Sequence, residues 1–85
     1  MITWEMVLSV LPTGKKLEEC YLAYRPWLRD KTHTHRVTVA INFKDSNNYR
    51  GYYTIYKHVY GATKDEAIKK MYNWLTHEYL GFNHD

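Results

Sequence analysis

The sequence predicts an α+β domain in which a three-stranded antiparallel sheet carries an N-terminal and a C-terminal helix on one face. Three segments support this: alternating apolar and polar residues at 35–44, a tyrosine-rich return at 51–60, and an amphipathic stretch at 63–80. The chain has 85 residues, which is room for a single domain spanning residues 1–85. Because 45% of the residues are hydrophobic, we expect a compact core.

Residues 3–11 are expected to form a short, largely apolar helix that ends before Pro12 and Gly14. Residues 15–25 fit either a helix or a strand, and Pro26 ends either one. We favour a strand. If this segment is helical instead, the sheet has only two strands.

The segment 35–44 is the clearest strand, because its apolar residues recur at every second position. These core-facing residues are Val37, Val39, Ile41 and Phe43. After turn residues at 45–48, the segment 51–60 returns as the third strand. Its expected core residues are Tyr53, Ile55 and Val59. Lys57 falls on the same inward face, which argues against this register.

Residues 63–80 form the clearest helix. Thr63 and Glu66 make a capping box, in which each side chain accepts a hydrogen bond from a free amide at the helix start, and Gly81 fits the helix end. At helical spacing the apolar residues fall on one arc: Ala67, Ile68, Met71, Trp74, Leu75 and Tyr79.

Composition excludes several classes of protein. The formal charge is +3 with a pI of about 9.0, which is less basic than a histone or a ribosomal protein. Cys20 is the one cysteine, so we expect no internal disulfide. No signal peptide and no apolar run of about 20 residues is present, so a cytoplasmic protein without a membrane contact is expected.

Enzymatic chemistry has weak support. His33 and His35 form an H-x-H pair, which holds zinc only with two further ligands, and no second Cys/His pair occurs. Cys20 lies among apolar residues, where a buried thiol is the usual occupant. The four glycines are scattered and form no phosphate-binding loop. We therefore expect a non-enzymatic protein with no cofactor and no metal site.

One sheet face is expected to stay uncovered, and it interleaves tyrosines with cations. Its expected partner-binding residues are Arg36, Lys44, Tyr52, Tyr56 and His58, and Tyr21 and Arg25 join them if the first strand exists. Such a face anchors protein partners or stacks nucleic-acid bases. The simpler interpretation is tyrosine pairing across strands on a solvated face.

The helix–strand–strand–strand–helix order resembles the double-stranded-RNA-binding domain. The matching residues are His33 before the second strand and the Gly61-Ala62-Thr63-Lys64 approach to Ala67. Of the family's lysine–lysine–any–alanine–lysine signature, only Lys64 and Ala67 match. The resemblance implies contact with a duplex by the first helix, the His33 loop and the start of the last helix. The nucleic-acid alternative uses Lys31, His33, His35, Lys64, Lys69 and Lys70.

The favoured function is a small interaction protein, of the inhibitor or adaptor type found in phages and mobile elements, that occupies a partner protein. We expect a macromolecular partner and favour a protein over a nucleic acid. Binding of double-stranded RNA or DNA is the alternative. The apolar first helix, with Trp4 and Leu8, is a second candidate surface and is equally suited to forming a homodimer.

Overall fold

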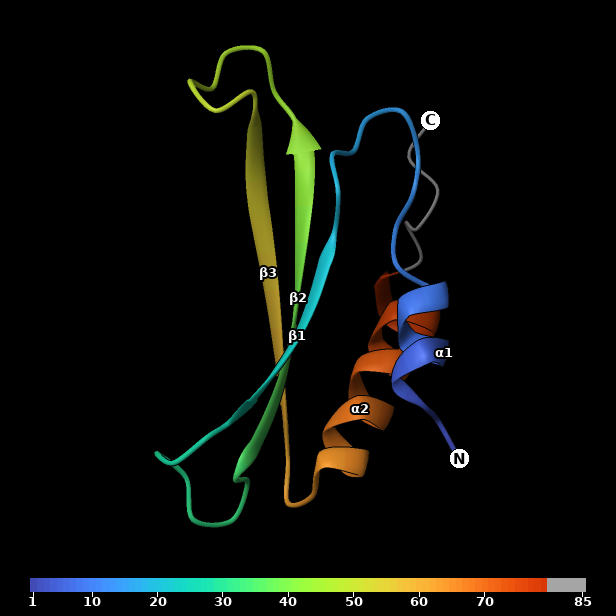
Figure 1. Cartoon of the computed structure of the whole chain (residues 1–85), viewed down its shortest axis with the longest axis vertical. Coiled ribbons are helices and arrows are strands. Elements are labelled where there is room, and N and C mark those ends of the chain that lie inside the picture. The colour runs from blue at the N-terminus through green and yellow to red at the C-terminus, as the bar shows by residue number, and fades with distance from the viewer. Residues whose placement is uncertain (80–85) are drawn as a thin grey trace.

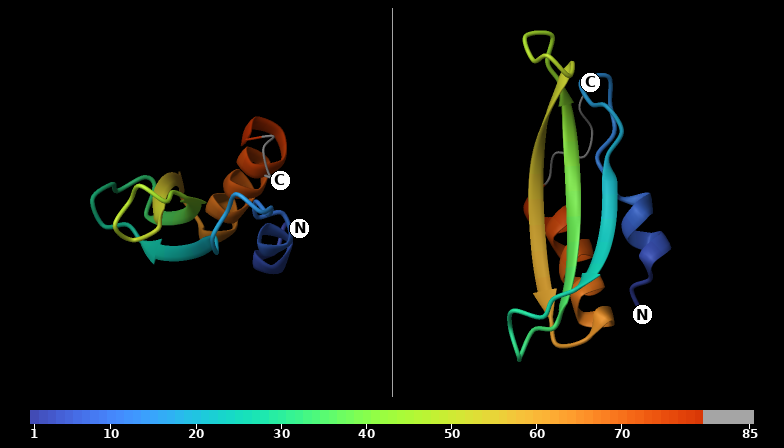
Figure 2. Two further views of the ribbon diagram at one scale, coloured as in Figure 1. Left: turned by 90° about the horizontal axis from the view of Figure 1, so that it is seen from above. Right: turned by 60° about the vertical axis from the view of Figure 1, so that its left-hand side comes forward.

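A computed structural model of the chain describes residues 1–79. Strands β1 (Tyr21–Pro26), β2 (His35–Lys44) and β3 (Tyr52–Gly61) form one antiparallel sheet in the order β1–β2–β3. Helices α1 (Trp4–Ser9) and α2 (Lys64–Asn73) both lie on one side of this sheet, and its other side is uncovered (Figures 1 and 2). The predicted fold class is confirmed. Within residues 1–79, no helix is long and apolar enough to cross a membrane.

The β2–β3 hairpin is the framework of the sheet. Its ten-residue strands pair along their full length, and β2 has the predicted bounds. In the turn, the Asp45 amide donates to the Gly51 carbonyl at 2.9 Å, and the Asp45 carboxylate accepts from the Asn47 amide at 3.0 Å. Gly51 has a φ of 80°, a conformation that favours glycine because it has no Cβ. These contacts fix the register of the hairpin.

The ambiguous segment 15–25 ends in a strand. β1 pairs with β2 from Tyr21 to Pro26, which confirms the favoured interpretation. The preceding residues are not helical; they run beside the far end of β2, where Leu17 forms a bridge with Phe43. Leu17 is only 6% exposed, so this approach to β1 also contributes to the core.

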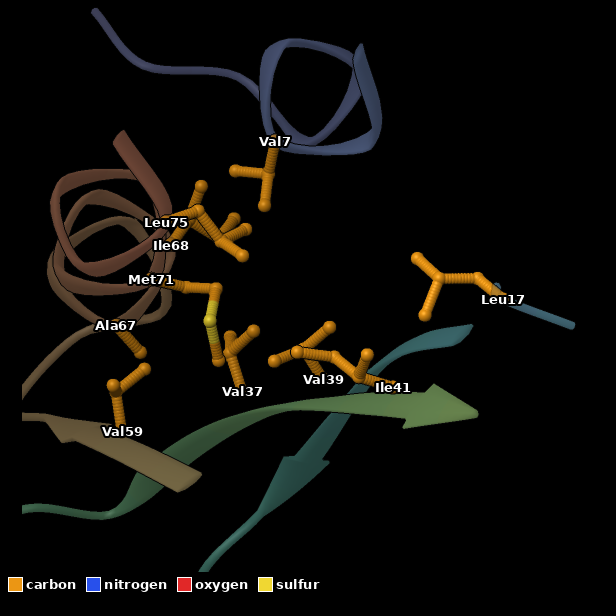
Figure 3. Close-up of a cluster of buried hydrophobic side chains, with 10 residues drawn as sticks. All are labelled: Val7, Leu17, Val37, Val39, Ile41, Val59, Ala67, Ile68, Met71 and Leu75. Atoms are coloured by element: carbon orange, nitrogen blue, oxygen red, sulfur yellow. The ribbon is translucent and has the colours of Figure 1, made fainter. Parts of the chain in front are cut away.

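Helix α1 is shorter than predicted. The Thr3 hydroxyl accepts a hydrogen bond from the Met6 amide at 3.2 Å, and the helix ends at Ser9 rather than at residue 11. The Ser9 hydroxyl donates to the Met6 carbonyl at 2.7 Å, a side-chain bond that competes with the backbone at the helix end. Only Val7 of this helix is fully buried, and Figure 3 shows it beside Leu75.

Helix α2 begins as its capping box predicts. The Thr63 hydroxyl accepts from the Glu66 amide at 3.1 Å, and the Glu66 carboxylate accepts from the Ala62 amide at 3.1 Å. Gly61 permits this tight entry, because a Cβ there would lie 2.7 Å from the Ala67 nitrogen. The α-helix ends at Asn73 and continues as a π-helical segment, η1 (Trp74–Tyr79). The predicted stop at Gly81 lies outside the described residues.

The core lies between α2 and the inner face of the sheet (Figure 3). Most of the residues predicted to face the core from β2 and the last helix are buried, but Phe43, Trp74 and Tyr79 are only partly buried against it. Val7 of the first helix and Leu17 complete the core. The core is Val7, Leu17, Val37, Val39, Ile41, Val59, Ala67, Ile68, Met71 and Leu75.

For two predicted core residues of β3, the predicted side of the sheet is correct but the predicted burial is wrong. Tyr53 and Ile55 lie on the inner face but are 43% and 46% exposed, whereas Val59 is 8% exposed. The reason is that α2 follows β3 directly and covers its Gly61 end, while the hairpin end extends past the helices (Figure 1). Lys57 does lie on the inner face, with its ammonium 5.5 Å from the centre of the Trp74 ring. A cation–π contact accommodates it there, so the predicted register is correct.

Candidate functional site

The open face is the side of the sheet that no helix covers. Since Val37, Val39 and Ile41 point toward α2, the residues between them point the opposite way. The strand register places outward-pointing side chains from β1, β2 and β3 side by side on this face. The open face is made by Tyr21, Ala23, Arg25, Arg36, Thr38, Ala40, Asn42, Lys44, Tyr52, Thr54, Tyr56, His58 and Tyr60. All five sequence-predicted partner-binding residues belong to it.

No strand of the sheet carries an acidic residue, and Asp30 is the only one between Glu19 and Asp45. Within residues 1–79 the structure has two ion pairs, Asp30 with His33 and Glu66 with Lys70, and neither uses a residue of the open face. The cations of this face are Arg25, Arg36 and Lys44. None of these three cations is paired with a carboxylate; the Glu19 carboxylate, which precedes β1, accepts a hydrogen bond from the Tyr21 hydroxyl at 3.1 Å.

Aromatic rings lie at the centre of β3. Tyr56 is 63% exposed, and its ring is parallel to that of His58, with a centroid distance of 6.3 Å and an interplanar angle of 6°. The His58 Nδ1 shares a hydrogen bond of 2.6 Å with the Thr38 hydroxyl, which fixes the imidazole against β2. Partial burial, and then the charge of Arg36, lower the pKa of His58 below its usual value. This shift favours the neutral imidazole, so we group His58 with the rings of the face and not with its cations.

A buried amide fixes the open face near its hairpin end. Asn42 is 6% exposed, and its Nδ2 donates to the Glu19 carbonyl at 2.5 Å. Its Oδ1 accepts from the Thr54 hydroxyl at 2.6 Å. Asn42 thus joins the approach to β1, the central strand and β3, so these three segments keep one geometry.

The two ends of the open face differ. At the hairpin end, Lys44 is exposed, and the Arg50 guanidinium carbon lies 5.3 Å from the Tyr52 ring centre. At the opposite end, Trp27 follows β1 directly and its ring centre lies 5.5 Å from that of Tyr60. Arg36 lies over the same indole at 4.4 Å. Cations and rings therefore run along the whole length of the sheet.

The structure brings together only some of the residues assigned to the nucleic-acid alternative. His35 shares a hydrogen bond of 2.6 Å with the Tyr24 hydroxyl, and the Lys64 ammonium lies 4.6 Å from the Tyr24 ring centre. Lys70 donates to the Tyr60 carbonyl at 2.7 Å and pairs with Glu66 at 3.3 Å, so its ammonium is already engaged. Lys31 lies in the β1–β2 loop and Lys69 on the exposed side of α2.

A shallow, open hollow of about 390 Å³ lies between the β1–β2 loop, the end of β3 and α2. It is lined by Asp30, His33, His58, Val59, Tyr60 and Lys70. The Asp30 carboxylate accepts from the Thr32 amide at 2.8 Å and from the Thr32 hydroxyl at 2.8 Å. These hydrogen bonds, and a weaker one from the His33 amide, lower the pKa of Asp30 to about 2.

The structure does not bring the candidate metal ligands together within residues 1–79. His33 faces Asp30 at 3.4 Å, whereas His35 is bonded to Tyr24, so the two imidazoles have separate environments. Within residues 1–79 no group of three or more His, Cys, Asp or Glu side chains is arranged to hold a metal ion. Partial burial raises the pKa of the Cys20 thiol, which disfavours the reactive thiolate.

Helix α1, the second candidate surface, shows a modest apolar patch. Met6 is 37% and Leu8 44% exposed, while Trp4 packs partly against the core. The described part of the chain shows nothing that covers these two side chains.

Sequence reasoning missed Trp27, Arg29 and Tyr60 as members of the site. Tyr60 could have been predicted from the sequence, because it continues the even-numbered alternation of Tyr52, Tyr56 and His58. Trp27 and Arg29 follow Pro26 in a loop, where no periodicity assigns a direction. Comparison with protein-family models, with curated proteins and with solved structures finds no match.

Proposed function

We propose that this protein is a nucleic-acid-binding module that holds a single strand on its open sheet face. The observation that carries the proposal is the composition of that face: tyrosines share it with Arg25, Arg36 and Lys44, and none of these three cations forms an ion pair within residues 1–79. The neighbouring carboxylate, Glu19, is bonded to the Tyr21 hydroxyl instead. Aromatic rings stack on bases, and cations contact phosphates.

A nucleic acid fits this face better than a protein does. The centre of a protein interface is usually apolar and depleted in charge. Here the face has no Leu, Ile, Val, Met or Phe, and its only aliphatic side chains are Ala23 and Ala40. A face made of rings, hydroxyls and cations matches the bases, sugars and phosphates of a nucleic acid.

A single strand fits better than a duplex. In a duplex the faces of the bases are already stacked on one another, so exposed rings have no base face to meet. Tyr56 and Tyr21 are 63% and 54% exposed and are placed on two different strands of the sheet. Rings at such positions suit the unstacked bases of a single strand.

The length of the face also suits a short oligonucleotide. Arg36 and Lys44 lie at opposite ends of β2, and at about 3.3 Å per residue they are roughly 26 Å apart. Single-strand-binding modules cover about 4–16 nucleotides.

Occupation of a partner protein, as an inhibitor or adaptor, is the second candidate. One observation favours it: Tyr, Trp and Arg are the residues that dominate protein-binding energy, and Tyr60, Trp27 and Arg36 lie together at the end of the sheet opposite the hairpin turn. A protein partner would show a weak dependence on salt at its core contacts, whereas phosphate contacts give a steep one.

The test is binding of fluorescein-labelled oligonucleotides of about 12 nucleotides, single-stranded or duplex, followed by fluorescence anisotropy at low salt. We expect the single strand to bind more tightly than the duplex. Tyr56→Ala should weaken single-strand binding by at least about 5-fold, since one stacked base contributes about 1–3 kcal/mol.

The matched control is Tyr49→Ala. Tyr49 is 94% exposed and lies in the hairpin turn, outside the open face, so its loss should leave affinity unchanged. Equal losses in the two variants, or no binding of any single strand at low salt, would overturn the proposal. Preference for the duplex would favour the surface formed by the His33 loop and the start of α2.

A further inference from the structure

Three arginines converge at the Trp27 end of the open face. Arg36 and Arg29 place their guanidinium carbons 4.4 Å and 5.3 Å from the centre of the Trp27 ring. Arg25 is the direct cross-strand partner of Arg36, on the same side of the sheet. We call these three residues and Trp27 the arginine cluster.

Like charges at directly opposed positions in a sheet are destabilising. The arginine cluster nevertheless has no counter-ion: none of its guanidinium groups belongs to an ion pair among residues 1–79. Asp30 is the only nearby acidic residue in the sequence, and its oxygens are used by Thr32 and His33. The three guanidinium groups therefore lie near one another without a paired carboxylate, and the ionised Asp30 next to Arg29 supplies one nearby negative charge.

The indole explains how the charge is held. Arginine packs well on an aromatic face, and two guanidinium groups on one indole are restricted in position. Because both arginines lie over this ring, Trp27 is better suited to positioning cations than to stacking on a base. The cluster adjoins the hollow, since the Tyr60 ring contacts Trp27 and also lines the hollow, together with Asp30, His33 and His58.

We propose that the arginine cluster binds the terminal phosphate of the nucleic acid that lies on the open face, an inference that rests on the proposed function. A phosphate monoester carries close to two negative charges at pH 7, whereas each phosphodiester along a strand carries one. Three arginines at one point match the terminal group, while the separate Lys44 matches a diester further along. Guanidinium groups bind phosphate oxygens in a bidentate manner, which ammonium groups do not.

The test compares the same short single strand with a 5′-phosphate, with a 3′-phosphate and with hydroxyls at both ends. We expect one phosphorylated form to bind at least about tenfold more tightly than the unmodified strand, the effect of one added charge-assisted hydrogen bond. Arg29→Gln and Arg36→Lys should each reduce this preference. Arg29 is an exposed loop residue, so its variant is expected to fold.

Arg50→Gln is the matched control, because Arg50 lies at the hairpin end and contacts Tyr52 instead. This variant should keep the full preference for a terminal phosphate. Equal affinity of the three strands, or a preference that survives both cluster variants, would overturn the terminal-phosphate site and leave single-strand binding intact.

A parallel titration with inorganic pyrophosphate separates the two proposals. The indole N–H signal of Trp27 in NMR spectra should shift on titration, and Arg29→Gln should abolish the shift. If pyrophosphate shifts this signal but no oligonucleotide binds, the phosphate site is supported and the nucleic-acid function is refuted. If neither ligand affects the signal, the phosphate site is refuted.

Discussion

Replacement of Lys44 by glutamine removes one cation from the hairpin end of the open face. Lys44 is exposed and is the last residue of β2, and no ion pair holds it among residues 1–79. The substitution keeps a polar side chain of similar length, so the fold should not change.

The expected size of the effect follows from the number of cations on the face. If Arg25, Arg36 and Lys44 each neutralise one phosphate of a single strand, the log–log slope of affinity against salt is about −2.1. Between about 50 and 200 mM salt, the affinity then falls about 18-fold. Without Lys44 the slope becomes about −1.4 and the loss about 7-fold.

The assay is fluorescence anisotropy of a strand without terminal phosphates, at four or more salt concentrations. Lys69→Gln is the matched control, since Lys69 is exposed on α2, on the other side of the sheet. If a duplex is instead held by the lysines of α2, the slope will change with Lys69 and not with Lys44. That result, or a slope near zero for the unmodified protein, would refute the reasoning.

Three further predictions concern stability. Asn42→Ala should destabilise the fold by about 1–3 kcal/mol, because two hydrogen-bonding groups lose their partner, and the Tm should fall by about 4–8 °C per kcal/mol; an unchanged Tm would contradict this role. Leu75→Ala should cost about 2–5 kcal/mol in chemical denaturation, whereas Leu8→Ala, at a side chain 44% exposed, should cost about 0.5 kcal/mol; similar costs would show that α1 is more closely packed than described. The pKa of Asp30 is lowered to about 2 in the folded protein, so ionised Asp30 stabilises the fold. This contribution is complete at pH values above the pKa of Asp30 in the unfolded chain, and it is lost as the pH falls toward 2. Asp30→Asn should therefore flatten the acid-induced fall in Tm. An unaltered dependence of Tm on pH would contradict the stabilising role of the hydrogen bonds from Thr32 to the Asp30 carboxylate.

The sequence was most informative where the pattern was long. Ten residues of strict alternation defined β2 to the residue, and the capping box of Thr63 and Glu66 defined the start of α2. The segment 15–25 is short and fits two periods equally well. Its strand forms because the edge of β2 offers hydrogen-bonding partners, and that is tertiary information.

Alternation gives the direction of a side chain but not its depth. Tyr53 and Ile55 point to the inner face as expected, yet they are exposed because the helices do not reach the hairpin end. For Lys57, a charge on the inner face looked like an error of register, but Trp74 accommodates it.

The candidate site was predictable in the same way. Arg36, Lys44, Tyr52, Tyr56 and His58 were placed together by alternation alone, and the structure shows them on one face. Only half of the arginine cluster was predictable: alternation placed Arg25 and Arg36 on this face, whereas Trp27 and Arg29 lie in a loop, where no periodicity assigns a direction. Its geometry depends on how the chain turns after Pro26.

The most direct test of single-strand binding is NMR mapping of the contact surface. Addition of an oligothymidine of about 12 nucleotides to the ¹⁵N-labelled protein should shift amide signals along β2 and β3 and the indole signal of Trp27. Signals from α1 should not move, because that helix lies on the opposite side of the sheet (Figure 1). Shifts confined to α1, or to the exposed side of α2, would contradict binding on the open face, as would a spectrum that does not change.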